Sequence, residues 1–387
     1  MVNRMRWSER CSIDLLRRML EIYSPSGRES AISSFLADVM VELGFSRVWK
    51  DKANNVYGEI GIGKPTILLC GHMDTVPGEI DVKLEGDRLY GRGAVDAKSS
   101  LAAMVLAAAS FKSEDLRGRV IVAGVVDEEG RGKGIRHLIR EGLNVDYAIF
   151  GEPSGIRNIT FAYKGHIKLK ITCETSTGHI GAQHVMPNAI EKCFDFWGKL
   201  RDLCDSKYRS PYGIFYSLTP TVTRISGGGA TRSIPDKCVL EIDLRLPPTI
   251  SCGKAMKIIE DLIAGFRDEN YGLNLSFKAI NMVEPYVADK GSIVVKALRE
   301  AIFEETGGEA RLIRKTGTGD MNIFGTYFKV PAATYGPGEA ALSHTFNESI
   351  DVKEYLTSIK IYKKAVEKIL GYYYLEGGVG AKDDAYR

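Results

Sequence analysis

Three short apolar runs in the first half of the chain each end in acidic or imidazole side chains. They cover residues 66–70, 120–126 and 147–150, and they lead into His72, into Glu128 with Glu129, and into Glu152. Such short runs, bounded by turn residues, are typical of buried strands. The pattern predicts one parallel sheet with a shared crevice at its carboxyl edge, where open α/β sheets place their sites.

Two further positions complete a candidate metal site. Asp96 stands just ahead of a predicted helix, and His344 lies far downstream. Two imidazoles and three carboxylates, with no thiolate, suit Zn²⁺ or Co²⁺ in a hydrolytic site better than they suit a closed structural site. A bridging carboxylate would reduce the number of ligands that two metal ions need, and such ions lie about 3.5–4 Å apart.

Asp74 and Glu128 are candidates for roles beside the metal ligands. A metal-binding imidazole needs an acceptor at its second ring nitrogen, and Asp74 lies two residues after His72. Glu128 and Glu129 are adjacent and point different ways in extended or turn geometry, so one can bind metal while the other serves as general base. The alternative for Glu128 is an acid at a helix N-terminus, favoured by the helix dipole.

These motifs, in this order and over nearly the whole chain, resemble the dinuclear zinc amidohydrolases. That family includes acetylornithine deacetylase, succinyl-diaminopimelate desuccinylase, aminoacylase and carboxypeptidase G. The resemblance implies two divalent metal ions in each subunit, Zn²⁺ or Co²⁺. It implies the following ligands: His72 and Glu152 for one ion, Glu129 and His344 for the other, and Asp96 as the bridge. It also implies that Glu128 is the general base and that Asp74 orients His72.

The resemblance assigns further residues to the substrate. His179, in the segment 177–183, resembles a histidine that reaches the partner subunit's active site and stabilises an oxyanion, which implies a homodimer. Its alternative is a turn histidine after Gly178. The candidates for substrate binding are Arg232, Arg245, Thr318 and Asp320. Arg232 stands where many relatives carry asparagine, Arg245 could instead pair with Asp243, and Asp320 could be a helix N-cap.

The motifs look closest to one branch of the family. That branch releases lysine, and in some organisms ornithine, from the C-terminal glutamate of a small acidic amino-group carrier protein, in lysine or arginine biosynthesis. Two alternatives stay open: a deacylase of small N-acyl-amino acids or a dipeptidase, and a metal-bearing binding protein without turnover. A pure binder has no use for a base such as Glu128, which argues against the second.

The order of predicted helices and strands along the chain indicates an α/β protein with two domains. A catalytic domain with a mixed, mostly parallel sheet flanked by helices is expected over residues 1–163 and 285–387. An inserted ferredoxin-like lid and dimerisation domain, with the order βαββαβ, is expected over 164–284. Helices are predicted over residues 13–22, 29–43, 97–111, 134–141, 188–203, 254–267 and 353–370.

Composition excludes several other classes of protein. A net charge of +3 is too small to imply nucleic acid. No apolar stretch is long enough to span a bilayer, and no secretory signal stands at the N-terminus, so a cytoplasmic enzyme is expected. Seven cysteines without a CxxC pair are expected to be mostly buried thiols, although a disulfide stays open. A phosphate loop at residues 91–99 is rejected because Ala97 replaces the required glycine.

Overall fold

An eight-stranded mixed sheet is the largest sheet of the computed structural model, which describes residues 8–228, 233–270 and 272–375. Its main path runs β1-β2-β6-β14-β7-β12, and β5 pairs with β2 while β13 pairs with β7. The strands are β1 (Arg47–Lys50), β2 (Val56–His72), β5 (Arg117–Val125), β6 (Tyr147–Gly151), β7 (Asn158–Tyr163), β12 (Tyr286–Val287), β13 (Arg311–Lys315) and β14 (Ala332–Tyr335).

The chain divides into two compact units. The second consists of Ala162–Val287 and Arg314–Asn322, and the first contains the rest. The segment Arg314–Asn322 thus groups with the second unit, whereas the boundaries expected from the sequence assign it to the catalytic domain. None of the helices in the described part of the chain is long and apolar enough to cross a membrane.

The first unit combines parallel strands with helices, as predicted. The pairs β2–β5, β2–β6 and β6–β14 are parallel. The helices are α1 (Glu9–Glu21), α2 (Ser30–Glu42), α3 (Lys98–Ala109), α4 (Lys133–Glu141), α7 (Ile293–Thr306), most of α8 (Asp320–Phe328) and α9 (Val352–Leu375). A small sheet adds β3 (Lys83–Glu85), β4 (Arg88–Tyr90) and β15 (Ser349–Asp351).

Helix α3 lies at the centre of the first unit's core. Its residues from Lys98 to Ala108 are all buried, because an Ala-rich helix that is apolar on most sides can pack against neighbours all round. It packs against β2 and α9. The predicted parallel register is also present: His72 is paired with Val125, and Gly71 with Gly151. Three strands therefore end side by side, and the residues that follow them meet at one edge.

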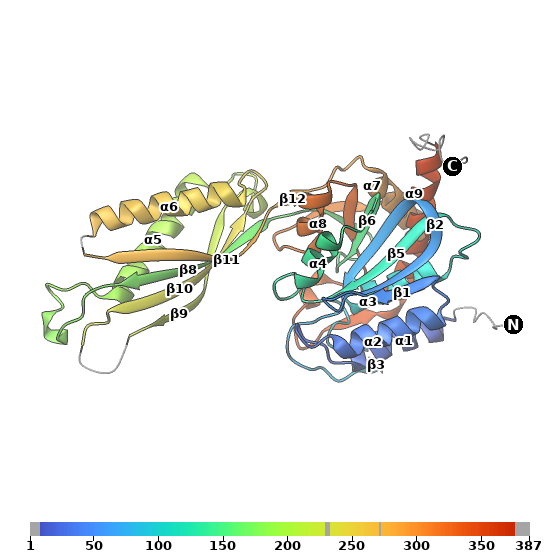
Figure 1. Ribbon diagram of the computed structural model, residues 1–387, viewed down its shortest axis with the longest axis horizontal. Coiled ribbons are helices and arrows are strands. Elements are labelled where there is room, and N and C mark those ends of the chain that lie inside the picture. Colours follow the sequence, from blue (N-terminus) through green and yellow to red (C-terminus); the bar gives the residue numbers. More distant parts are fainter. Residues whose placement is uncertain (1–7, 229–232, 271, 376–387) are drawn as a thin grey trace. The chain divides into compact units, whose positions relative to one another are not determined.

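The second unit has its own sheet and core, with the predicted order βαββαβ. Its strands are β8 (Gly165–Glu174), β9 (Thr219–Gly227), β10 (Lys237–Leu246) and β11 (Asn274–Val283), in the spatial order β11-β8-β10-β9. Helices α5 (Ala189–Lys207) and α6 (Cys252–Glu269) lie along one face of this antiparallel sheet (Figure 1). A separate apolar cluster lies between them and the strands. The seven cysteines all lie within the described residues and form no disulfide there, and all but Cys11 are buried.

A large-to-small change in this second core tests its packing. Phe196 is fully buried on α5 and packs edge-on against Phe266, with ring centroids 5.6 Å apart. Phe196→Ala should lower the free energy of unfolding of this unit by about 3–5 kcal/mol, because it leaves a cavity. Urea unfolding followed by circular dichroism measures the change. Phe194→Ala on the same helix is the control, since Phe194 is 57% exposed, and equal destabilisation by both would contradict the packing.

Candidate metal centre

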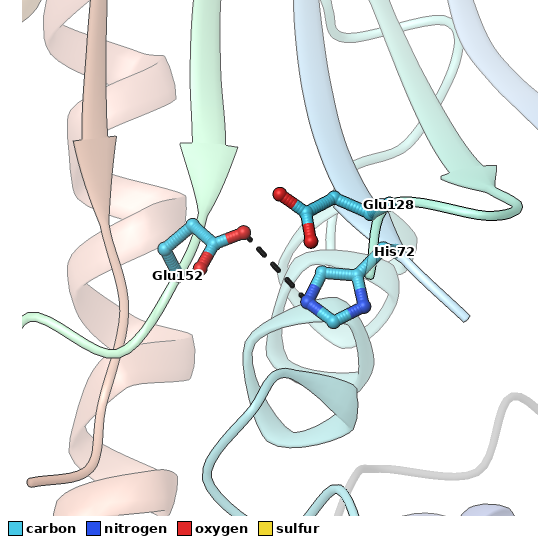
Figure 2. A group of neighbouring side chains, drawn as sticks. All are labelled: His72, Glu128 and Glu152. Carbon is cyan, nitrogen blue, oxygen red and sulfur yellow. Dashed lines mark ion pairs between the residues drawn. The ribbon is translucent and has the colours of Figure 1, made fainter. Parts of the chain in front are cut away.

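Six side chains converge at the carboxyl edge of the first unit's sheet, in two groups. His72, Glu128 and Glu152 form one group, and Asp96, Glu129 and His344 form the other. Within each group the potential ligand atoms lie within 4.8 Å of one another. Figure 2 shows the first group, with the three side chains directed toward one another and the ion pair between His72 and Glu152 dashed.

Four of these six residues occupy the end of a strand or the turn that follows one. His72 is the last residue of β2, the Glu128-Glu129 pair lies in the turn between β5 and α4, and Glu152 directly follows β6. Asp96 lies in the turn before α3, and His344 follows the short 3₁₀ helix Ala340–Leu342. The convergence of segments so distant in sequence follows from the parallel order of the strands.

Asp96 lies between the two imidazoles. Its Oδ1 is 3.2 Å from Nε2 of His72, and its Oδ2 is 3.4 Å from Nε2 of His344. Beyond it, Nε2 of His344 is 2.8 Å from Oε1 of Glu129, and Nε2 of His72 is 3.7 Å from Oε1 of Glu152. One carboxylate that offers a separate oxygen to each group is the arrangement required of a ligand that bridges two cations.

The charge of the cluster favours cations. Burial lowers the pKa of His72, but the hydrogen bond with Asp96 and the charges of Glu152, Glu128 and Asp74 outweigh it and raise that pKa well above its ordinary value. Hydrogen bonds with Asp96 and Glu129 raise the pKa of His344 to about 10. Nitrogen and oxygen ligands surrounded by excess negative charge fit divalent ions such as Zn²⁺ or Co²⁺.

The Asp74 carboxylate holds the turn that carries the two glutamates. Its Oδ1 accepts a hydrogen bond from the backbone N–H of Glu128, and its Oδ2 accepts one from that of Glu129, both at 3.0 Å. The expected orientation of His72 comes instead from the carbonyl oxygen of Asp74, 2.9 Å from Nδ1, while the carboxylate is 3.7 Å away. Asp74 is fully buried, so its charge depends on these donors and on the hydroxyl of Ser26, 2.7 Å away.

Glu128 lies in a turn rather than in the first turn of a helix. The preceding residue, Asp127, has a φ of 60°, and its side chain accepts hydrogen bonds from the N–H groups of Arg131 and Lys133. Helix α4 begins only at Lys133, so the helix-dipole alternative for Glu128 does not describe this structure. The turn presents Glu128 to one group of ligands and Glu129 to the other.

The candidates for substrate contact belong to the second unit, apart from Arg232, which lies outside the described residues. His179 is exposed, and its Nδ1 accepts a hydrogen bond from the N–H of Gly181. Arg245 pairs with Asp243 at 2.6 Å. Thr318 is hydrogen-bonded to Nδ1 of His166 at 3.2 Å, and Asp320 is the first residue of α8.

Several supporting residues have no clear signal in the sequence. Glu29 is buried and accepts hydrogen bonds from the N–H groups of Gly27 and Asp127. Arg92 and Glu348 form a buried ion pair at 2.8 Å. Arg92 does lie inside the Gly-rich segment that ends in Asp96, but its acceptors come from distant segments, which no local pattern indicates.

The fold and the two ligand groups define a metal-binding hydrolase, and comparison with known proteins identifies its family. The chain belongs to peptidase family M20/M25/M40, whose model matches residues 68–368. It is 34% identical to a [LysW]-lysine hydrolase of Deinococcus radiodurans, over 92% of this chain and 97% of that protein. It is 36% identical to a putative [LysW]-lysine/[LysW]-ornithine hydrolase of Pyrococcus furiosus, over 92% and 96%.

Solved structures agree on the fold. The aminopeptidase PepT of Bacillus cereus matches with a TM-score of 0.78 at 20% identity, over 94% of this chain and 99% of that one. A protein of Bacillus subtilis described as a dinuclear metal-binding peptidase of the M20 family matches with a TM-score of 0.70 at 15% identity, over 93% and 98%.

Metal uptake should release protons. With a pKa of about 10, the imidazole of His344 is protonated near pH 7.5 in the metal-free chain, and only a neutral imidazole binds metal. The apparent affinity for Zn²⁺ should therefore rise with pH over about 6 to 9. Calorimetric titration in buffers of different ionisation enthalpy measures the protons released. His344→Ala should release fewer, and an affinity that does not change with pH would contradict the assignment.

Proposed function

We propose that this protein is a hydrolase with two metal ions that releases lysine, ornithine or both from an amino-group carrier protein. The bond cut would join the γ-carboxyl of the carrier's C-terminal glutamate to the α-amine of the amino acid. The observation that supports this most is a near full-length similarity to proteins named [LysW]-lysine and [LysW]-ornithine hydrolases. It occurs in a chain whose first unit contains two adjoining groups of residues that could each hold a metal ion.

Within this proposal His72 and Glu152 would hold the first ion, Glu129 and His344 would hold the second, and Asp96 would contribute to both. Such ions, Zn²⁺ or Co²⁺, polarise a carbonyl and lower the pKa of water when bound. Glu128 takes the proton from the attacking water and later gives it to the leaving amine nitrogen. The backbone N–H groups of Glu128 and Glu129 donate hydrogen bonds to the carboxylate of Asp74, which fixes the turn that carries both glutamates.

His179 is proposed to donate a hydrogen bond to the oxygen of the tetrahedral intermediate in a partner subunit. Because its Nδ1 accepts from Gly181, the ring proton of the neutral form lies on Nε2, which leaves a donor directed away from its own backbone. Ile180 is 55% exposed and Val185 is 70% exposed. Large apolar side chains exposed close to His179 in the sequence support the proposal of a homodimer interface here.

Basic side chains close to the centre support an acidic partner. Arg157 and Arg311 line a hollow of about 330 Å³ together with Glu339 and Glu354. The hollow lies beside the segments that carry Glu152 and His344, because its walls include Ser154 and Ala340. Both arginines are exposed, and within the described part of the chain neither guanidinium has a hydrogen bond or ion pair. Such groups can attract carboxylates of an approaching protein.

The remaining parts of the proposal concern the cell. A carrier-dependent step of lysine or arginine biosynthesis would take place in the cytoplasm. Buried thiols, such as those of this chain, are compatible with that reducing compartment.

Glu128→Gln tests the general base. The substitution removes the proton acceptor but keeps the shape of the side chain, so hydrolysis should fall by about 10²- to 10⁴-fold. Metal content should stay at the wild-type value, because Glu128 is not a proposed ligand. Single-turnover assays and elemental analysis measure the two quantities. Full activity in this variant would remove Glu128 from the mechanism.

Release of free lysine and ornithine from their carrier conjugates tests the substrate. The metal-loaded enzyme should release them, and N-acetylornithine and succinyl-diaminopimelate should react poorly. The Michaelis constant for the carrier should rise with salt, since screening weakens attraction between exposed charges. Arg157→Gln with Arg311→Gln should reduce this dependence. Activity on the small acyl compounds alone, or an equal salt effect on all substrates, would overturn the carrier assignment.

A further inference from the structure

A buried ion pair connects two of the candidate ligands without itself belonging to either ligand group. Arg92 is 4% exposed and Glu348 is 1% exposed, and their charged groups lie 2.8 Å apart. Neither residue belongs to the two groups of potential metal ligands. Buried charges persist only when they are paired and hydrogen-bonded, so the other bonds of this pair show what it holds in place.

Glu348 holds the segment that leads to Asp96. Its Oε1 accepts hydrogen bonds from the backbone N–H groups of Gly93, Val95 and Asp96, at 3.1, 3.0 and 2.9 Å. Three donors on one carboxylate oxygen form a charge-assisted set of bonds. The backbone of Asp96 is therefore fixed directly by the side chain of Glu348.

Arg92 holds the segment that follows His344. One guanidinium nitrogen donates to the carbonyl oxygen of Thr345 at 3.0 Å, and Nε donates to that of Gly78 at 2.8 Å. His344 has a φ of 64°, in the left-handed region that a residue with a side chain adopts at a cost. Its side chain is also half exposed, so few packing contacts fix it. The bond to Thr345 therefore restrains a ligand that has few other restraints.

We infer that Arg92 and Glu348 are positioning residues that set the distance between Asp96 and His344, and so determine how tightly the second metal ion binds. The inference rests on the proposed two-ion centre and does not depend on which amide is cut. The group of His72, Glu128 and Glu152 should depend on the pair less. His72 and Glu152 stand at the ends of β2 and β6, and the backbone of Glu128 is held by Asp74.

Glu348→Gln separates this role from general stabilisation. One oxygen becomes an NH₂ group, which cannot accept a hydrogen bond and has no charge to pair with Arg92. The affinity for the second ion should fall by about 10- to 100-fold, the range typical of residues that orient metal ligands, whereas the affinity for the first ion, which shares only Asp96 with this network, should fall less. Arg92→Lys keeps the positive charge but loses the planar guanidinium, so it should also lower the affinity for the second ion.

Co²⁺ titration of the metal-free full-length chain, followed by visible absorption and by elemental analysis after dialysis, gives the affinity and number of ions. Thermal unfolding of the metal-free chain gives its stability. Glu59→Gln is the control, because Glu59 pairs with Arg119 at 3.9 Å within the same sheet, and it should leave both ions in place. If Glu348→Gln does not fold, Arg92→Lys is the variant that tests the inference.

A larger loss of affinity for the second ion than for the first supports the inference. Wild-type affinity for both ions in the folded variants would overturn it. An equal loss of affinity for both ions, together with a matching loss of thermal stability in the metal-free chain, would overturn it as well, because the pair would then only stabilise the fold. A wild-type chain that binds a single ion would contradict the proposed centre itself, and this outcome is visible before any variant is made.

Discussion

The concentration of negative charge at one edge of a sheet is the constraint on which the rest of this structure depends. Like charges a few ångströms apart repel strongly where water is excluded, so each carboxylate needs donors or a cation. The carboxylates of Asp74 and Glu348 accept hydrogen bonds from backbone N–H groups, which carry no net charge. Asp96 and Glu129 instead pair with the imidazole of His344. A metal cation can take the place of the proton on that imidazole.

The hydrogen bonds that backbone N–H groups donate to Asp74 and Glu348 also fix the loops around the centre. Each such bond ties the charge of a buried acid to the path of a loop, so the ligands cannot shift without exposing an unpaired charge. Removing one member of a buried ion pair costs about 3–5 kcal/mol. The pair of Arg92 and Glu348 therefore restrains the geometry more strongly than exposed ion pairs such as Arg17 with Asp14, which water and salt screen.

Most of the candidate ligands could be predicted because His72, Glu129 and Glu152 each lie where an apolar run gives way to an acid or an imidazole. Asp96 was indicated instead by its place ahead of a predicted helix, and His344 has no such run before it. The turn of Glu128 and Glu129 follows directly from the strand before it, and the parallel register then brings it beside His72. The supporting bonds could not be predicted. A carboxylate such as Glu348 that binds backbone N–H groups far away in the sequence leaves no periodic pattern, and neither does a carbonyl oxygen that accepts from an arginine.

The parts of the fold that sequence reasoning missed have comparable causes. Strand β2 begins at Val56, ten residues before the apolar run that indicated it, because glycines at 58, 61 and 63 and Pro65 weaken the pattern of its first half. Strand β14 is only four residues long, and its sequence, Ala-Ala-Thr-Tyr, has little β-preference beyond its last two residues. It is nevertheless buried at the centre of the sheet beside β6, so tertiary pairing decides its conformation.

Metal binding and the predicted substrate contacts fall largely in different units, and the segment Arg314–Asn322 illustrates this division. In sequence it interrupts the first unit, yet it groups with the second. The side-chain amide of Asn322 donates to the carbonyl oxygens of Lys164 and Glu284, and His166 is hydrogen-bonded to Thr318. All proposed metal ligands belong to the first unit, as do Arg157 and Arg311, while the described residues that the sequence predicted to contact substrate belong to the second. Because each unit has its own core, substitutions that alter substrate preference can accumulate in the second without disturbing the ligands in the first.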